Sequence, residues 1–138
     1  MFEHVCHIRV RYGETDQMGY VYYGNYSLYY EQGRTEAIKS LGVSYKSMEE
    51  QGFMMPVADM KVRYKGAAKY DELLKVVTTV PELPGRSMTF KTKIYNEEGR
   101  LINEGETNLL FIKADTRKPC SAPSQLVAAL QPHFKMAL

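Results

Sequence analysis

Residues 12–26 hold an unusual concentration of side chains that could take part in chemistry. The segment reads YGETDQMGYVYYGNY and carries two acids, three glycines and five tyrosines in fifteen positions. A carboxylate such as Asp16 can attack an electrophilic carbon or activate a water molecule, and glycines let the main chain pass close to a ligand. Aspartate also commonly holds a turn through backbone hydrogen bonds. The residues alone leave both roles open for Asp16.

A helix is predicted to begin directly after this segment. From Tyr26 to Leu41 apolar residues recur at three- and four-residue steps, which is typical of an amphipathic helix. Asn25 is the expected N-cap, and Gly42 stands at the expected C-terminal cap. The first turn of a helix presents unpaired N–H groups and the positive end of the helix dipole. A carboxylate held near that turn, as we expect for Asp16, should stay ionised.

Five segments show the alternation of apolar and polar residues that is typical of half-buried strands. They are residues 5–12, 57–64, 73–80, 88–95 and 108–112. One strand, one long helix and then a run of strands with short links predicts an α+β fold, with a twisted antiparallel sheet curled around the helix. A short helix is predicted over 123–131. An exposed edge of such a sheet favours pairing of two copies.

The length and composition are those of one globular domain, which we place over residues 1–138. The chain is 44% hydrophobic and 25% charged, with a formal net charge of +2, which is too small to indicate a polyanion such as nucleic acid as partner. No apolar run is long enough for a membrane span, and the first residues do not read as a signal peptide. We expect a cytoplasmic protein.

The cysteines and histidines indicate neither a disulfide framework nor a metal site. Cys6 and Cys120 are the two cysteines, and we expect both to be reduced thiols. His4, Cys6 and His7 lie close in sequence, but a strand directs His7 to the opposite face from the other two. We therefore expect no metal and no cofactor.

Residues 12–26 and the positions after them resemble a known enzyme family. The matching pattern is Tyr12, Thr15-Asp16, Gly19, Val21-Tyr22-Tyr23 and Asn25-Tyr26, followed by Glu31 and Arg34-Thr35-Glu36. Further matching blocks are 60–64, 67–68, 70–74 and 85–90, so the resemblance covers roughly residues 5 to 115. This pattern resembles the signature of hotdog-fold acyl-CoA thioesterases of the 4-hydroxybenzoyl-CoA thioesterase and YbgC type.

The resemblance implies a hotdog fold, with a five-stranded antiparallel sheet wrapped around one long helix. It implies hydrolysis of the thioester of a small or medium acyl-CoA to the free acid and CoA, at sites formed between the subunits of a homodimer or homotetramer. Asp16 matches the catalytic carboxylate, as nucleophile or as general base. The backbone N–H of Tyr23 matches the group that binds the thioester carbonyl oxygen, and such a donor typically contributes about 10²–10³ in rate.

Binding of the substrate requires cations for the phosphates of CoA and an apolar slot for the acyl group. Arg86 is the first candidate among the cations, because the resembling family places nucleotide contacts near that turn. Lys65 and Lys69 are further candidate cations, and Met54 and Met55 are further candidates for the slot. The expected substrate-binding residues are Tyr20, Gly24, Asn25, Met60, Lys61, Arg63, Arg86 and Ser87.

Two other acids near Asp16 receive simpler interpretations. Glu14 is expected to be a solvated charge. Glu31 is expected to form an ion pair with Arg34, either within the helix or at an interface. The chain has no G-x-S-x-G elbow and no phosphate-binding loop of the Walker type, which argues against serine hydrolases and nucleotide hydrolases. The alternatives that stay open are hydrolysis of acyl carrier protein thioesters and a non-catalytic module that binds acyl-CoA or RNA through residues 61–69.

Overall fold

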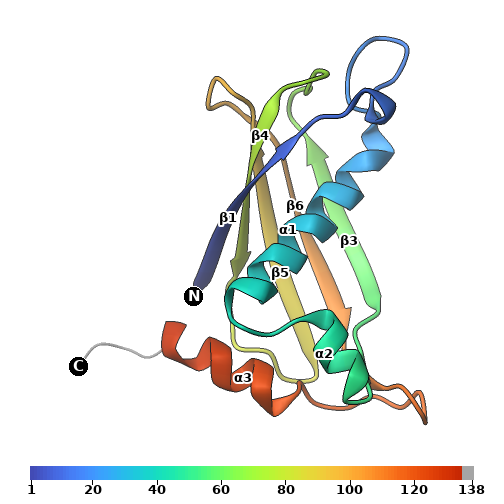
Figure 1. Ribbon diagram of the computed structural model, residues 1–138, viewed down its shortest axis with the longest axis vertical. Coiled ribbons are helices and arrows are strands. Elements are labelled where there is room, and N and C mark those ends of the chain that lie inside the picture. Colours follow the sequence, from blue (N-terminus) through green and yellow to red (C-terminus); the bar gives the residue numbers. More distant parts are fainter. Residues whose placement is uncertain (135–138) are drawn as a thin grey trace.

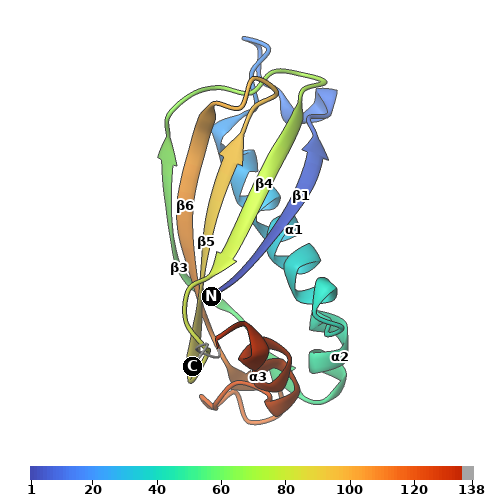
Figure 2. The same ribbon diagram turned by 90° about the vertical axis from the view of Figure 1, so that its left-hand side faces the viewer.

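One long helix, α1 (Tyr26–Ser40), lies against a five-stranded antiparallel sheet in the computed structural model, which describes residues 1–134 (Figure 1). The sheet has the strand order β1-β4-β5-β6-β3. Its members are β1 (Phe2–Arg9), β3 (Val57–Tyr64), β4 (Leu73–Val80), β5 (Ser87–Tyr95) and β6 (Leu101–Leu110). The side view shows α1 covering one face of the sheet while the other face is left open (Figure 2). The α+β prediction is confirmed, and residues 135–138 of the expected domain lie outside the described part.

Several predicted bounds were wrong. The first strand ends at Arg9, because Tyr12–Glu14 forms a 3₁₀ turn, η1, instead of continuing the strand. The last long strand, β6, begins at Leu101 and pairs with both β5 and β3. Its first half was missed because Glu104, Gly105 and Glu106 interrupt the apolar pattern.

Smaller elements close the lower end of the molecule as it is drawn in Figure 1. The helix α2 (Tyr45–Glu50) and the strand pair β2 (Phe53–Met54) and β7 (Ile112–Lys113) were not predicted. The C-terminal helix was predicted and is found as α3 (Ser124–Leu130), followed by a 3₁₀ turn, η3 (Gln131–His133). None of the helices within residues 1–134 combines the length and the apolar character that a membrane crossing requires.

The two ends of α1 are fixed by different means. A 3₁₀ turn, η2 (Tyr23–Asn25), leads directly into the helix, so Asn25 already has helical dihedral angles of −80° and −13° and its side chain caps nothing. Asn25 therefore occupies the predicted N-cap position, but its side chain makes no capping hydrogen bond. At the other end Gly42 has a φ of +81°, which is the left-handed conformation that glycine adopts most easily when it ends a helix.

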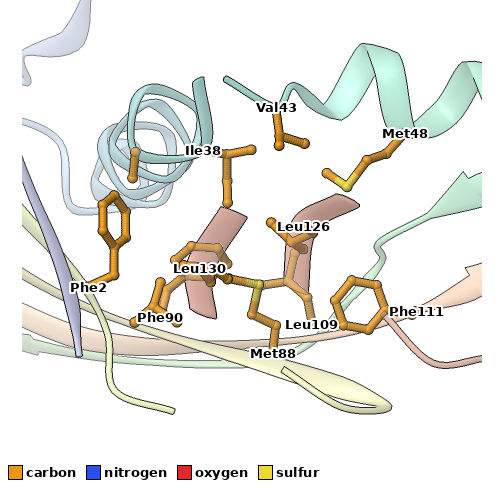
Figure 3. Close-up of a cluster of buried hydrophobic side chains, with 12 residues drawn as sticks. Phe2, Ile38, Val43, Met48, Met88, Phe90, Leu109, Phe111, Leu126 and Leu130 are labelled. Atoms are coloured by element: carbon orange, nitrogen blue, oxygen red, sulfur yellow. The ribbon is translucent and has the colours of Figure 1, made fainter. Parts of the chain in front are cut away.

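The core has an upper and a lower part along α1. The upper core surrounds the start of the helix and consists of Ile8, Val10, Val21, Tyr26, Tyr29, Tyr30, Ala68, Leu74, Val76, Ile94 and Ile102. The lower core lies between the sheet, the end of α1, α2 and α3 (Figure 3). It consists of Phe2, Ala37, Ile38, Val43, Met48, Val80, Met88, Phe90, Leu109, Phe111, Leu126 and Leu130.

A close approach between α1 and β6 sets the position of the upper core. A Cβ atom at Gly105 would lie only 2.6 Å from Cε2 of Tyr30, so a glycine is needed where the tyrosine ring crosses the strand. The Tyr30 hydroxyl donates a hydrogen bond to Oδ1 of Asn103 on the same strand. The Tyr30 side chain therefore packs α1 closely against β6.

Candidate active site

A short hairpin carries the chain from β1 to the start of α1, at the top of Figure 1. Tyr22 N–H donates to the Glu14 carbonyl at 2.9 Å, and Asp16 N–H donates to the Tyr20 carbonyl at 2.7 Å. Gly19 reverses the chain with a φ of +82°. The hairpin therefore places Asp16 at its tip and delivers Tyr22 to the first turn of the helix.

The Asp16 carboxylate is clamped by this hairpin through one of its oxygens. Oδ1 accepts the N–H groups of Met18 at 2.9 Å and Tyr20 at 3.2 Å. Oδ2 has no hydrogen-bond partner within residues 1–134. The residue is exposed and borders an open cavity of about 780 Å³, which Tyr12 and Tyr70 also line. The carboxylate is thus both held in place and accessible.

The main chain of Tyr23 offers a free donor at the start of the helix. Tyr23 is the first residue of η2, and its N–H makes no hydrogen bond to any residue in the described range. The Tyr23 carbonyl accepts the Tyr64 hydroxyl at 3.3 Å, and the Tyr22 ring lies over Gly24, where a Cβ atom would meet it at 2.7 Å. An unpaired amide at a helix N-terminus can bind a negatively charged oxygen.

Glu14 is buried, so the interpretation as a solvated charge was wrong. It is only 9% exposed, and its carboxylate accepts hydrogen bonds from Arg11 and from the Tyr29 hydroxyl. Burial alone raises the pKa of this carboxyl, but the hydrogen bonds from Arg11 and Tyr29 outweigh it and lower the pKa of Glu14 below its usual value. Burial, together with the hydrogen bond to Glu14, raises the pKa of Tyr29. Tyr29 lies fifteen residues after Glu14, and no sequence pattern predicts that the two side chains meet.

Four of the expected substrate-binding residues lie in the Asp16 hairpin, in η2 or against the upper core. Tyr20 is half-buried, and its main chain forms a bridge to Lys69. Gly24 and Asn25 belong to η2, and the Asn25 side chain donates to the Glu14 carbonyl at 2.9 Å. Met60 packs against the upper core from β3.

The expected CoA-binding cations lie elsewhere in the chain. Lys61 and Arg63 alternate with Met60 and Val62 along β3, so they face the open side of the sheet, where they border a second cavity of about 510 Å³ with Lys91. Asp16 does not line that cavity.

Arg86 and Ser87 lie at the lower end of β5, opposite to the end near Asp16. The Arg86 carbonyl accepts the N–H of Phe111 at 3.3 Å, and Ser87 pairs with Leu110 at the end of β6. Nine residues of β-strand span roughly 30 Å. Met54 and Met55 lie at this end as well, in β2 and against the lower core. Within one chain these residues and Asp16 do not come together.

Two further expectations can be compared with the structure. Arg34 is 5% exposed, Glu31 is exposed, and no ion pair joins them within residues 1–134. The pair is therefore not formed within one chain, and a pair at an interface stays a prediction. Cys6 and Cys120 are free thiols. Within the same residues, no group of three or more His, Cys, Asp or Glu side chains is arranged to hold a metal ion.

The family of the chain is shown by comparison with known proteins. The model of the thioesterase-like superfamily matches residues 10–130. The chain belongs to this superfamily. It is 38% identical to YneP of Bacillus subtilis over 81% of either chain. It is 31% identical to the acyl-CoA thioester hydrolase YbgC of Escherichia coli over 88% of this chain and 90% of that protein.

A solved structure agrees with this assignment. The DHNA-CoA thioesterase of Staphylococcus aureus superimposes with a TM-score of 0.86 and 38% identity, over 99% of this chain and 98% of the other. The predicted family and the hotdog fold are thereby confirmed. The enzyme is a thioester hydrolase, as the family resemblance implied.

Proposed function

We propose that Asp16 and the backbone N–H of Tyr23 act on the same thioester group. The observation that carries this proposal is the hairpin, which joins a clamped, accessible carboxylate to the free amide at the helix start. The carbonyl oxygen of the substrate would accept the Tyr23 N–H, with the positive end of the α1 dipole behind it. The carbonyl carbon would then face Oδ2 of Asp16.

Two chemical routes fit this arrangement, and both stay in the proposal. In the first, Asp16 adds to the carbonyl carbon, the C–S bond breaks, and water then cleaves the mixed anhydride to release the acid. In the second, Asp16 takes a proton from water, which adds directly to the carbonyl carbon before the C–S bond breaks. In both routes CoA leaves as a thiolate that takes up a proton.

We further propose that CoA binds across two copies of the chain, as a homodimer or homotetramer. Arg86 and Ser87 lie at the opposite end of the sheet from Asp16, so only a second, oppositely directed copy can bring them to the same substrate. Among the described residues 1–134, strand β3 is an edge that pairs with β6 alone, and an open edge favours the pairing of two copies. Lys61 and Arg63 on this strand would then lie at the border between the two copies.

The cavity beside Asp16 supports a small or medium acyl group with a flat shape. The exposed rings of Tyr12 and Tyr70 pack edge to face with 5.6 Å between their centres and line the same cavity as Asp16. Aromatic side chains bind planar groups well, and the Staphylococcus aureus relative is named for the aromatic thioester DHNA-CoA. Tyr20 and Met60 would extend the apolar surface. We place the enzyme in the cytoplasm, which suits its two free thiols.

The test is thiol release from a panel of aromatic and aliphatic acyl-CoAs by the wild type, Asp16→Asn and Asp115→Asn. Asp115 is an exposed aspartate that holds a turn at the lower end of the molecule through Thr116 N–H, so it matches Asp16 in type but not in place. We expect Asp16→Asn to lose about 10²–10⁴ in kcat and Asp115→Asn to retain full turnover. The same panel on acyl carrier protein, and a binding assay with RNA, separate the two alternatives.

A further inference from the structure

Glu14 is the residue that joins the Asp16 hairpin to α1. Its Oε1 accepts hydrogen bonds from the Tyr29 hydroxyl at 2.9 Å and from Arg11 N–H at 2.8 Å. Its main-chain oxygen accepts the Tyr22 N–H and Nδ2 of Asn25, each at 2.9 Å. Tyr22 and Asn25 lie on either side of Tyr23 in the chain. One residue therefore holds the helix with its side chain and both flanks of the Tyr23 amide with its main chain.

This hydrogen-bond network is buried, so water cannot easily replace a hydrogen bond that is lost. Tyr29 is 1% exposed and belongs to the upper core, and Glu14 is 9% exposed. Buried hydrogen bonds are strong and hold a defined geometry, and their loss leaves a polar group without a partner. Arg11 adds its guanidinium to Oε2 of Glu14 at 2.9 Å, so the carboxylate has a donor on each oxygen.

We propose that Glu14 and Tyr29 form a positioning pair, which sets the separation between the Asp16 carboxylate and the Tyr23 amide during thioester hydrolysis. The proposal rests on the roles given to Asp16 and Tyr23 above. Asp16 follows Glu14 by two residues, and Tyr23 follows Tyr22, whose N–H is bound to Glu14. A shift of Glu14 relative to the helix therefore moves the two reacting groups apart. Neither member of the pair lines the cavity beside Asp16, so both act through other residues.

The kinetic signature of such a pair differs from that of a residue that merely supports folding. Misplacement of reacting groups lowers kcat, because the correct geometry is needed in the transition state. The affinity for CoA depends on other residues, so KM should change little. A residue that only stabilises the fold lowers the amount of folded enzyme and leaves the kcat of the folded fraction unchanged.

Tyr30 provides a matched control on the same helix. Like Tyr29 it is fully buried, and its hydroxyl donates a hydrogen bond, but the acceptor is Asn103 on the sheet instead of Glu14. The experiment measures kcat, KM and thermal unfolding for Tyr29→Phe and Tyr30→Phe with an acyl-CoA that the wild type hydrolyses. We expect Tyr29→Phe to lower kcat about tenfold or more with KM within about twofold of wild type. We expect Tyr30→Phe to retain the kcat of the wild type.

A double substitution shows whether the two residues act together. In Glu14→Gln, which keeps the size of the side chain, kcat should already be low, and adding Tyr29→Phe should lower it by less than it does in the wild type. Equal kcat for Tyr29→Phe and Tyr30→Phe would overturn the proposal, and so would fully independent effects of Glu14→Gln and Tyr29→Phe. Asp16→Asn distinguishes failure of the positioning pair from failure of the proposed function. If it is inactive while Tyr29→Phe is fully active, only the positioning pair is wrong, whereas an active Asp16→Asn removes the proposed function itself.

Discussion

The upper and lower cores differ in what their buried side chains carry. The lower core consists of aliphatic, methionine and phenylalanine side chains, which contribute through burial alone (Figure 3). The upper core contains three tyrosines, and the hydroxyls of Tyr29 and Tyr30 bind Glu14 and Asn103. Burial is non-directional, whereas hydrogen bonds fix distances and angles. The comparison indicates that the lower half supplies stability. In the upper half the bond of Tyr29 to Glu14 sets the geometry of the Asp16 hairpin, whereas the bond of Tyr30 to Asn103 joins α1 to the sheet.

The largest expected effect comes from a cavity in the lower core, which tests whether the two halves have separate roles. Phe90 is fully buried between the sheet and α3, so Phe90→Ala should lower the free energy of unfolding by about 3–5 kcal/mol. Urea unfolding measures this loss. Because Phe90 belongs to the lower core, kcat per folded molecule should stay at the wild-type value. A large fall in that kcat under conditions where the variant is folded would show that the two halves are not separable.

The second-largest expected effect is a loss of stability when a buried hydrogen bond of the upper core is removed. Tyr30→Phe removes the hydroxyl that binds Asn103 and leaves the buried Oδ1 of this side chain without a donor. The free energy of unfolding should fall by about 1–3 kcal/mol, as measured by urea unfolding beside Phe90→Ala. A variant as stable as the wild type would mean that the hydroxyl contributes no net stability, and the contrast between the cores would then rest on Tyr29 alone.

The smallest effect is a dependence of stability on pH that originates in the upper half. The pKa of Glu14 is lower in the folded protein than its ordinary value of 4.5, so the folded state favours the ionised carboxylate, which faces Arg11 and Tyr29. This stabilisation is fully present above pH 4.5 and is lost as the pH falls through the lower, folded-state pKa. Glu14→Gln should therefore lose less stability than the wild type between neutral and acid pH, as followed by thermal unfolding. Parallel curves for both proteins would contradict the role of Glu14 as a bound anion.

The sequence allowed prediction of the elements whose pattern is local. The helix from Tyr26, four of the five sheet strands and the α+β class follow from residue periodicity. The first half of β6 could not be predicted, because Gly105 is there to admit the ring of Tyr30, a contact between residues 75 positions apart in sequence. Glu14 was misjudged for a related reason. A buried carboxylate is recognised by its partners, and Tyr29 becomes a partner only when the hairpin folds onto α1.

The candidate site was predictable in part. Asp16 and Tyr23 lie seven residues apart in sequence, so the residues alone predicted that both belong to the segment that leads into the helix. The position of Arg86 relative to Asp16 depends on which end of β5 the residue occupies and on the arrangement of two copies, neither of which a local pattern contains. The alternation along β3 determines which side of the sheet Lys61 and Arg63 face. The position of these two cations relative to the site depends on the second copy.

The central claim is that one thioester lies between the carboxylate of residue 16 and the amide of residue 23. A crystal structure of Asp16→Asn with an intact acyl-CoA tests it most directly. The account predicts that the thioester oxygen lies about 2.7–3.1 Å from the Tyr23 nitrogen and that the carbonyl carbon faces the side chain of residue 16. An acyl-CoA bound in an ordered position with its thioester away from both groups, for example on the face of Lys61 and Arg63, would contradict the account.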